Sequence, residues 1–194
     1  MNFLEERIVK DGQVREGEIL KVDSFLNHQL DIGLLEQIGE AFYDHFRDKH
    51  ITRVLTVESS GIAVAFPAAR KFGVPVVFAK KSRSRNLDGD LYTSIVHSFT
   101  YNVDNLVTLS KQYLHEDDTV LIVDDFLANG KAVQGLLDIC RQAGAQVAGI
   151  GIAIEKGFQC GGKNLREAGY DLYSLAIVDE MKEDGTLVFR ENTI

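Results

Sequence analysis

The segment VLIVDDFLANGKA, residues 120–132, constrains the fold and chemistry of this chain more than any other part of the sequence. Its apolar run Val120–Val123 predicts a buried strand, which we expect to end at the carboxylates Asp124 and Asp125. A short loop over Leu127–Gly130 follows, and then an amphipathic helix begins. Because open α/β sheets bind ligands at the carboxyl ends of their strands, the segment predicts a binding site.

The loop and the start of the helix in this segment suit a phosphate group. Free backbone N–H groups and the helix dipole favour an anion at a helix N-terminus. The two carboxylates can hold hydroxyl groups or face a developing positive charge, so a phosphorylated sugar fits the whole segment. The alternative is a Rossmann-like strand with two solvated aspartates. A Walker nucleotide loop is disfavoured, because the order GxxxxGK[ST] does not occur here.

The composition describes an ordinary globular chain. With 194 residues, 45% hydrophobic and 26% charged, residues 1–194 are expected to form a single domain with a sizeable core. The net charge of −8 argues against broad nucleic-acid binding, which usually requires a basic face. Two cysteines are too few for a secreted disulfide framework, so a reduced cytoplasm is expected. Neither a signal peptide nor an apolar run of the ~20 residues that a membrane helix needs is visible.

Hydrophobic periodicity predicts a mostly parallel sheet flanked by helices, because strands and helices alternate after residue 52. The core is expected over about residues 51–180, with an N-terminal appendage over about 1–50 that is irregular or short-stranded at 18–30. The expected helices are 2–11, 31–48 (with Asp31 as N-cap), 61–72, 131–143 and 163–168. The expected strands are 53–57, 75–79, 93–100, 104–110, 119–123, 147–155, 172–178 and, at the sheet edge, 186–190.

Two further segments are candidate anion sites. In Glu58–Gly61, ESSG, small residues let the backbone approach an anion closely, although an ordinary strand-to-helix turn with a serine N-cap is the alternative. In Lys80–Arg85, KKSRSR, four cations occur within six residues of an acidic chain. A mobile basic loop there could close over an anionic leaving group and exclude water, and a solvated surface loop is the alternative.

Two other segments suit a flat heterocycle. Residues 20–29, LKVDSFLNHQ, mix apolar anchors with amide and imidazole groups, as expected of a small hood over a ring. In residues 154–158, IEKGF, Lys156 can donate to a carbonyl oxygen and Phe158 can stack on the ring. A surface lysine beside a core phenylalanine is the alternative for this second segment.

The segment 120–132 resembles the phosphoribosyl pyrophosphate (PRPP) motif of type I phosphoribosyltransferases, which is a hydrophobic strand, two acids and a loop ending near a glycine. Members of the hypoxanthine–guanine branch usually carry Asp where this chain has Ala128, and Thr where it has Asn129 and Ala132. These departures remove a candidate general base and two phosphate-binding hydroxyls, while the adenine branch shares the alanine. Residues 20–29 and 154–158 resemble those of bacterial xanthine phosphoribosyltransferases, so the resemblance covers the whole chain.

The resemblance implies a type I phosphoribosyltransferase fold with a small N-terminal hood. It implies transfer of ribose 5-phosphate from PRPP to N9 of xanthine, giving xanthosine monophosphate and pyrophosphate in purine salvage. It also implies Mg²⁺ bound mainly through PRPP or pyrophosphate with no dedicated protein metal site, and a cytoplasmic homodimer that binds neither nucleic acid nor membrane. The residues implied are Asp124, Asp125 and Lys81 for catalysis; Leu20, Asn27 and Lys156 for the base; Ala128, Asn129, Gly130, Lys131 and Ala132 for the 5-phosphate; and Ser59, Ser60 and Gly61 for pyrophosphate.

Two alternatives to this function stay open. The first is a general 6-oxopurine enzyme acting on guanine or hypoxanthine, because guanine shares O6 with xanthine and Asn27 can donate or accept. The second is a PRPP-sensing transcription regulator without catalysis. Such a regulator needs a DNA-binding module, but the 52 residues before the first core strand are not basic and show no recognition-helix pattern.

Overall fold

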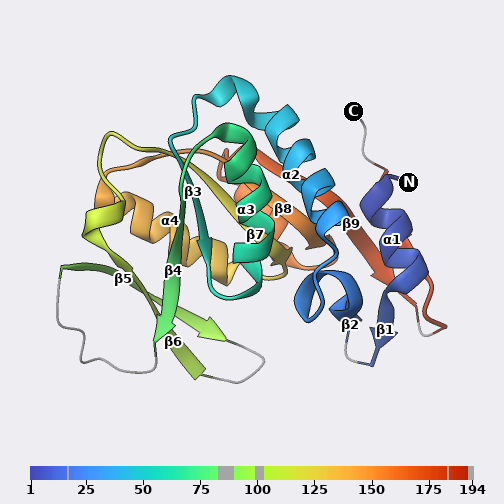
Figure 1. Ribbon diagram of the computed structural model, residues 1–194. Helices are drawn as coiled ribbons and strands as arrows, with labels where there is room; N and C mark the ends of the chain where they lie inside the picture. Colours follow the sequence, from blue (N-terminus) through green and yellow to red (C-terminus); the bar gives the residue numbers. More distant parts are fainter. Residues whose placement is uncertain (17, 83–89, 99–102, 183, 192–194) are drawn as a thin grey trace.

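The computed structural model describes residues 1–16, 18–82, 90–98, 103–182 and 184–191 (Figure 1). A central 8-stranded sheet has the order β10-β9-β8-β7-β3-β4-β6-β5, and β1 and β2 form a separate 2-stranded sheet. The α-helices are α1 (Phe3–Asp11), α2 (Ile32–Phe46), α3 (Ser60–Phe72), α4 (Lys131–Ala143) and α5 (Cys160–Glu167), and the shorter helical turns are η1 (Asp23–Asn27), η2 (Arg47–Lys49) and η3 (Lys111–Tyr113). The strands are β1 (Gln13–Arg15), β2 (Ile19–Lys21), β3 (Arg53–Val57), β4 (Val76–Ser82), β5 (Leu91–Ser98), β6 (Val103–Ser110), β7 (Thr119–Leu127), β8 (Gln146–Lys156), β9 (Leu172–Met181) and β10 (Leu187–Phe189).

The centre of the sheet is parallel, as the alternation of elements predicts. The neighbouring strands β9, β8, β7, β3 and β4 all run in the same direction. The edges are antiparallel, with β10 beside β9 at one edge and the β5–β6 pair beside β4 at the other. The parallel strands β3, β7 and β8 therefore all finish at the same end of the sheet. This is the end at which the sequence predicts the site.

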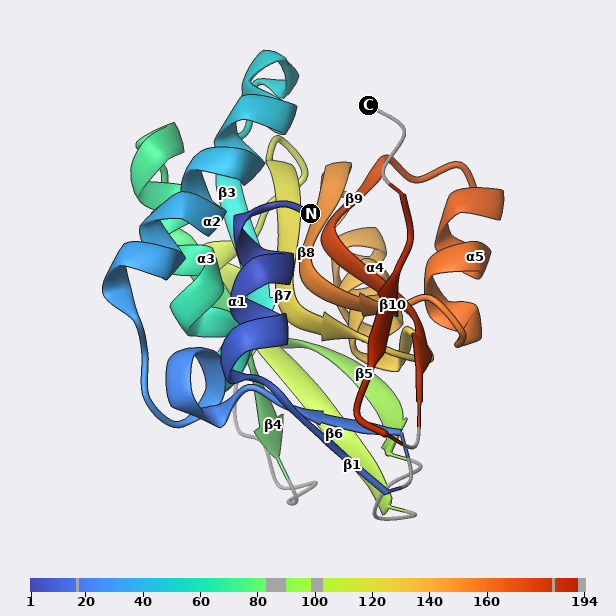
Figure 2. The ribbon, with the colours of Figure 1, turned by 90° about the vertical axis from the view of Figure 1, so that its right-hand side faces the viewer.

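Helices cover both faces of the sheet (Figures 1 and 2). On one face, α1, η1, α2 and α3 contribute buried side chains such as Ile8, Phe25 and Phe42 to one core cluster. On the other face, α4 and α5 contribute Leu136, Ile139 and Leu165 to a second cluster. Both faces of β7 are buried, because it lies between the two clusters in the middle of the sheet. None of the helices in the described ranges is long and apolar enough to span a membrane.

In the N-terminal appendage, α1 and α2 lie over one face of the sheet, and the β1–β2 hairpin lies toward the carboxyl ends of the parallel strands (Figure 2). A capping box between Asn2 and Glu5 begins α1, and the Asp31 side chain accepts from the Leu34 N–H to begin α2, as predicted. Between these helices lie the β1–β2 hairpin and the turn η1. Strand β2 and η1 fall within residues 18–30, which the sequence predicts to be irregular or short-stranded. From here on the hood is the hairpin and the turn together, residues 13–16 and 18–29, which include the segment 20–29 that the sequence identifies.

The prediction that the motif strand ends before Asp124 is wrong. Strand β7 continues through both aspartates to Leu127, so the loop before α4 is 128–130 and not 127–130. The pairing of β7 with β3 extends only to Ile122, but its pairing with β8 continues to Leu127. Backbone pairing with β8 keeps β7 extended at Asp124 and Asp125, although their polar side chains suggest that the strand has ended.

The prediction that Lys80 and Lys81 lie in a loop is also wrong, because both belong to β4. Their backbones pair with β6, which extends β4 three residues beyond the expected end at Ala79. The remaining expected loop, 83–89, lies outside the described residues, so its arginines are not placed. Helix α5 begins at Cys160 and not at Lys163, which places this cysteine at the start of a helix.

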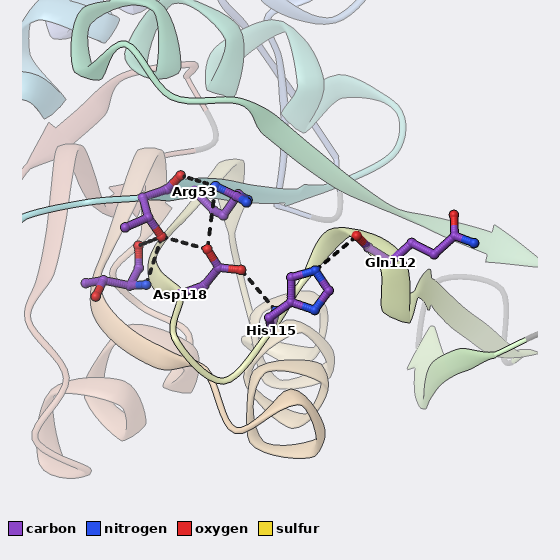
Figure 3. Close-up of polar contacts among 6 residues, drawn as sticks. Arg53, Gln112, His115 and Asp118 are labelled. Atoms are coloured by element: carbon purple, nitrogen blue, oxygen red, sulfur yellow. Dashed lines mark hydrogen bonds and ion pairs between the residues drawn. The ribbon is translucent and has the colours of Figure 1, made fainter.

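At the opposite end of the sheet, where the parallel strands begin, polar side chains link β3 to β7 (Figure 3). Asp118 is 5% exposed, and its carboxylate accepts from the Thr52 hydroxyl at 2.8 Å and the His115 backbone N–H at 3.0 Å. Arg53 lies 3.5 Å from the same carboxylate. This network fixes the starts of the two strands whose other ends carry the candidate site.

Candidate functional site

The acid pair of β7 lies buried at the carboxyl end of the sheet. Asp124 is 5% exposed and Asp125 7% exposed, and the Asp125 backbone N–H donates to Asp124 Oδ1 at 3.1 Å. Burial, followed by the negative charge of Asp125, raises the pKa of Asp124 well above the ordinary value for an aspartate. The ionised form of Asp124 is therefore disfavoured in the free protein, and a cationic or hydroxyl-bearing ligand would stabilise it.

The loop before α3 lies directly against Asp124. A Cβ atom on Gly61 would be 2.8 Å from Asp124 Oδ1, so only a residue without a side chain allows this approach. Ser59 precedes the helix, but its side chain makes no capping hydrogen bond. The alternative interpretation of ESSG, an ordinary turn with a serine N-cap, expects such a bond. The structure thus brings two predicted segments, 58–61 and 124–125, into one site.

Strand β4 brings Lys81 to the same region. The Lys81 backbone N–H donates to Glu58 Oε1 at 2.7 Å, so this strand and the 58–61 loop are joined. The positive charge of Lys81 acts on Asp124, because it opposes the rise in the pKa of that carboxyl. The exposed lysine side chain thus lies within electrostatic reach of the acid pair.

The loop 128–130 turns the chain from β7 into α4. Gly130 has φ of 81°, in the left-handed region, and acts as the N-cap of the helix. The Asn129 side chain accepts from the Lys131 backbone N–H at 3.2 Å. With Ala128 and Ala132 on either side, this turn presents the helix N-terminus that the sequence predicts for a phosphate.

The hood meets the end of β8 through Lys156. The Lys156 ammonium donates to the Glu18 backbone carbonyl at 2.8 Å, and burial lowers the pKa of this lysine. In the hood, Leu20 is 6% exposed and belongs to the core, whereas Asn27 is exposed at the end of η1. The structure therefore brings Lys156 against the hood and places Leu20 more deeply than a surface contact with a ring requires.

A partly buried ion pair supports the strand end that carries Lys156. Glu155 is 1% exposed, and both its carboxylate oxygens accept from Arg166 of α5 at 2.7 Å. The Ser174 hydroxyl donates to the same carboxylate. Because bidentate pairs fix geometry strongly, this contact holds α5 against β8 beside the site.

The acids of the site do not form a metal cage. Within the described ranges, no group of three or more His, Cys, Asp or Glu side chains is placed to hold a metal ion. A hydrated Mg²⁺ held largely by substrate phosphates needs only one or two protein carboxylates, and Asp124 and Asp125 can supply them.

Comparison with known proteins identifies the family. Residues 27–164 match the family model described as the phosphoribosyl transferase domain. The chain belongs to the phosphoribosyltransferase family. The match includes Asn27, the 58–61 loop, the acid pair, Lys156 and the start of α5, so most of the site described above is family sequence.

Two relatives show how far this phosphoribosyltransferase resembles named proteins. It is 58% identical over 192 residues to the xanthine phosphoribosyltransferase of Bifidobacterium adolescentis, covering 98% of this chain and 100% of the relative. It is 56% identical to the xanthine phosphoribosyltransferase of Ruminiclostridium cellulolyticum, with 98% and 100% of the two chains covered. Phosphoribosyl transfer is thus the activity of the family to which the site belongs, and this family generally uses Mg²⁺ with PRPP.

Solved structures confirm the expected type I phosphoribosyltransferase fold. The adenine phosphoribosyltransferase of Giardia lamblia complexed with 9-deazaadenine matches with a TM-score of 0.76 at 20% identity, covering 91% of this chain and 98% of the other. The adenine phosphoribosyltransferase of Thermoanaerobacter pseudethanolicus matches with a TM-score of 0.74 at 23% identity, covering 90% and 98%. At these identities the likeness concerns the fold.

The sequence analysis of this phosphoribosyltransferase missed a residue that shapes the phosphate turn. Gly161, the second residue of α5, donates its backbone N–H to the Ala128 carbonyl at 3.1 Å. A Cβ atom at this position would lie 2.4 Å from the same oxygen and 2.7 Å from the Gly130 nitrogen. The paired glycines at 161–162 are a visible signal, but only the folded chain shows that they face the turn.

Gly161→Ala is therefore expected to displace the phosphate turn of this phosphoribosyltransferase. The backbone atoms around it cannot move independently of α4, so KM for PRPP should rise about 10- to 100-fold. Steady-state kinetics with varied PRPP measure the effect. Gly33→Ala is the control, because its Cβ would meet nothing closer than 3.5 Å. Equal KM values for wild type and Gly161→Ala would contradict the role of this contact.

Proposed function

We propose that this protein is a xanthine phosphoribosyltransferase, a pentosyltransferase of purine salvage. It joins N9 of xanthine to C1 of PRPP and releases pyrophosphate, giving xanthosine monophosphate. The observation that carries the proposal is the 58% identity to a protein of that name over 98% of this chain. The buried acid pair between the 58–61 loop and the phosphate turn supports it independently.

In the proposed reaction, Asp124 and Asp125 hold the ribose hydroxyls. The transition state carries positive charge on the ribose, and these two carboxylates place negative charge beside it. The turn of residues 128–132 binds the 5-phosphate through backbone N–H groups at the start of α4. Ribose and phosphate are then held at the same edge of the sheet.

The 58–61 loop and Lys81 stabilise the pyrophosphate leaving group in this proposal. Ser59, Ser60 and Gly61 supply hydroxyl and backbone groups, and Lys81 supplies positive charge. Mg²⁺, when bound with PRPP, neutralises pyrophosphate charge and is held mainly by the substrate. No strong general base lies in the described part of the site, so positioning and electrostatic stabilisation supply most of the rate.

Xanthine is proposed to lie between β8 and the hood. Lys156 donates to O6 of the purine, Asn27 contacts its edge, and Leu20 supports the hood beneath it. The contact between Lys156 and the Glu18 carbonyl supports this placement, because it brings the lysine and the hood together.

The proposal extends to the organisation of the enzyme in the cell. We propose a single domain over residues 1–194 and a homodimer. We also propose a cytoplasmic location, which the unpaired cysteines Cys140 and Cys160 support. The partners are xanthine and PRPP, with neither nucleic acid nor membrane, and the net charge of −8 supports the first of these exclusions.

A substrate panel tests the proposed function. Purified protein with PRPP and Mg²⁺ should form nucleotide fastest from xanthine, more slowly from guanine and hypoxanthine, and not from adenine. Equal turnover of guanine and xanthine would favour a general 6-oxopurine enzyme. No nucleotide from any base, together with retardation of purine-operon DNA in a gel shift, would favour a PRPP-sensing regulator.

A further inference from the structure

A buried hydroxyl beneath the site has no partner. Thr56, the fourth residue of β3, has 0% of its surface exposed. Its Oγ1 makes no hydrogen bond in this structure, although a buried hydroxyl without a partner is costly. Neither the sequence motifs nor the roles proposed above use this residue, so its hydroxyl requires an explanation.

The unpaired hydroxyl faces the acid pair across Gly61. A Cβ atom at residue 61 would lie 2.2 Å from Thr56 Oγ1 and 2.8 Å from Asp124 Oδ1. The two oxygens therefore border the same small space, which the missing side chain of the glycine leaves open. Thr56 and Asp124 belong to neighbouring parallel strands, β3 and β7, so both approach this space from rigid elements.

A carboxylate is the chemical partner that this hydroxyl lacks. Asp124 Oδ1 already accepts from the Asp125 backbone N–H at 3.1 Å, but a carboxylate oxygen can accept more than one hydrogen bond. A hydroxyl can rotate to donate, and a donor to an ionised carboxylate forms a stronger hydrogen bond than one to a neutral acceptor. The two oxygens are not hydrogen-bonded to each other in this structure, so the bond requires them to approach one another.

We propose that Thr56 is a positioning residue, whose hydroxyl donates to the Asp124 carboxylate when PRPP is bound and thereby sets the direction in which that carboxylate faces the ribose. Gly61 then has two roles. It belongs to the proposed pyrophosphate loop, and its lack of a side chain leaves open the space in which Thr56 and Asp124 meet. The inference rests on the proposed function, since it assigns Asp124 to the ribose of PRPP.

The test compares Thr56→Val, which keeps the shape and removes the hydroxyl, with Thr56→Ser, which keeps the hydroxyl. Thr56→Val should lower kcat/KM for PRPP about 10- to 100-fold, the effect of one hydrogen bond to a charged group. We expect the loss both in KM for PRPP, because the hydrogen bond forms when PRPP binds, and in kcat, because the orientation of the carboxylate matters as charge develops. Thr56→Ser should keep activity within about threefold of wild type.

Thermal unfolding separates this role from a structural one. Because the hydroxyl has no partner in the free protein, Thr56→Val should be at least as stable as wild type while losing activity. A Thr56→Val protein with wild-type kinetics would overturn the proposal, and so would equal activity losses in the Val and Ser variants. A Val variant that loses stability and activity together would also overturn it, because the hydroxyl would then have a structural role in the free protein.

Calorimetric titration with PRPP and Mg²⁺ distinguishes the failure of this inference from the failure of the proposed function. If wild type forms no nucleotide from any purine but binds PRPP, the proposed function fails. In that case, weaker binding of PRPP by Thr56→Val than by Thr56→Ser would support the inference, and equal binding would overturn it.

Discussion

Replacing both acids, Asp124→Asn with Asp125→Asn, is expected to abolish turnover while the fold survives. Each carboxylate is more than nine-tenths buried beside the position proposed for the ribose, so two neutral amides would remove the negative charge that faces the transition state. Loss of one such electrostatic contact typically costs about 10²- to 10³-fold in kcat, and loss of the pair should cost more. Steady-state kinetics measure the turnover, and circular dichroism shows whether the fold survives.

The stability of the double variant should be equal to or above that of wild type. Burial and the charge of Asp125 raise the pKa of Asp124. The ionised pair therefore destabilises the folded protein relative to the unfolded chain. Asp44→Asn on the exposed surface of α2 is the control, because its side chain is 60% exposed and should change neither property. A folded double variant with near-normal turnover would refute the assignment of the acids.

The raised pKa of Asp124 also fixes the sign of the pH dependence. The reaction requires the carboxylate, so activity should be present above the pKa of Asp124 and lost as the pH falls through it. Because that pKa lies above its ordinary value, the loss should begin at a higher pH than an exposed aspartate would give. Measurement of kcat/KM for PRPP against pH, in wild type and Asp124→Asn, checks whether this acid limb belongs to Asp124.

Elements bounded by strong local signals could be predicted from the sequence. Strand β3 and helix α4 have the predicted bounds, Arg53–Val57 and Lys131–Ala143, because an apolar run with polar flanks and a helix between glycines define them locally. The acid pair and the 58–61 loop meet as expected, since parallel strands bring their carboxyl ends together. These parts of the candidate site follow from chain order and the parallel sheet.

Features set by a partner element could not be predicted in the same way. Strand β7 continues past Asp124 because β8 pairs with it, and β4 includes Lys81 because β6 pairs with it. Gly161 shapes the phosphate turn from the start of α5, about 30 residues further along the chain. A single sequence contains the residues of such contacts but not their distances.

The second large effect concerns the choice of purine. Lys156→Ala should lower kcat/KM for xanthine, guanine and hypoxanthine together, by about 10- to 100-fold, because a donor to O6 serves every 6-oxopurine. The same change breaks the contact between Lys156 and the Glu18 carbonyl. Lys156→Met, which keeps the apolar stem and lacks the donor, tests whether loss of the donor rather than loss of packing is responsible. Lys163→Ala on α5 is the control, with a side chain that is 74% exposed and no place in the proposed site.

Asn27→Ala should act differently from the change at Lys156, because discrimination between xanthine and guanine must come from the hood. Xanthine carries an oxygen at position 2 where guanine carries an amino group, so a donor on Asn27 or a nearby backbone N–H pairs with xanthine and is left unpaired by guanine. In a dry site this costs about 1–3 kcal/mol, roughly tenfold to a hundredfold in kcat/KM. Kinetics with both bases should therefore show a smaller xanthine-to-guanine ratio for Asn27→Ala and an unchanged ratio for Lys156→Ala. A wild-type enzyme that uses the two bases equally would remove the discrimination that this argument explains and leave a general 6-oxopurine enzyme.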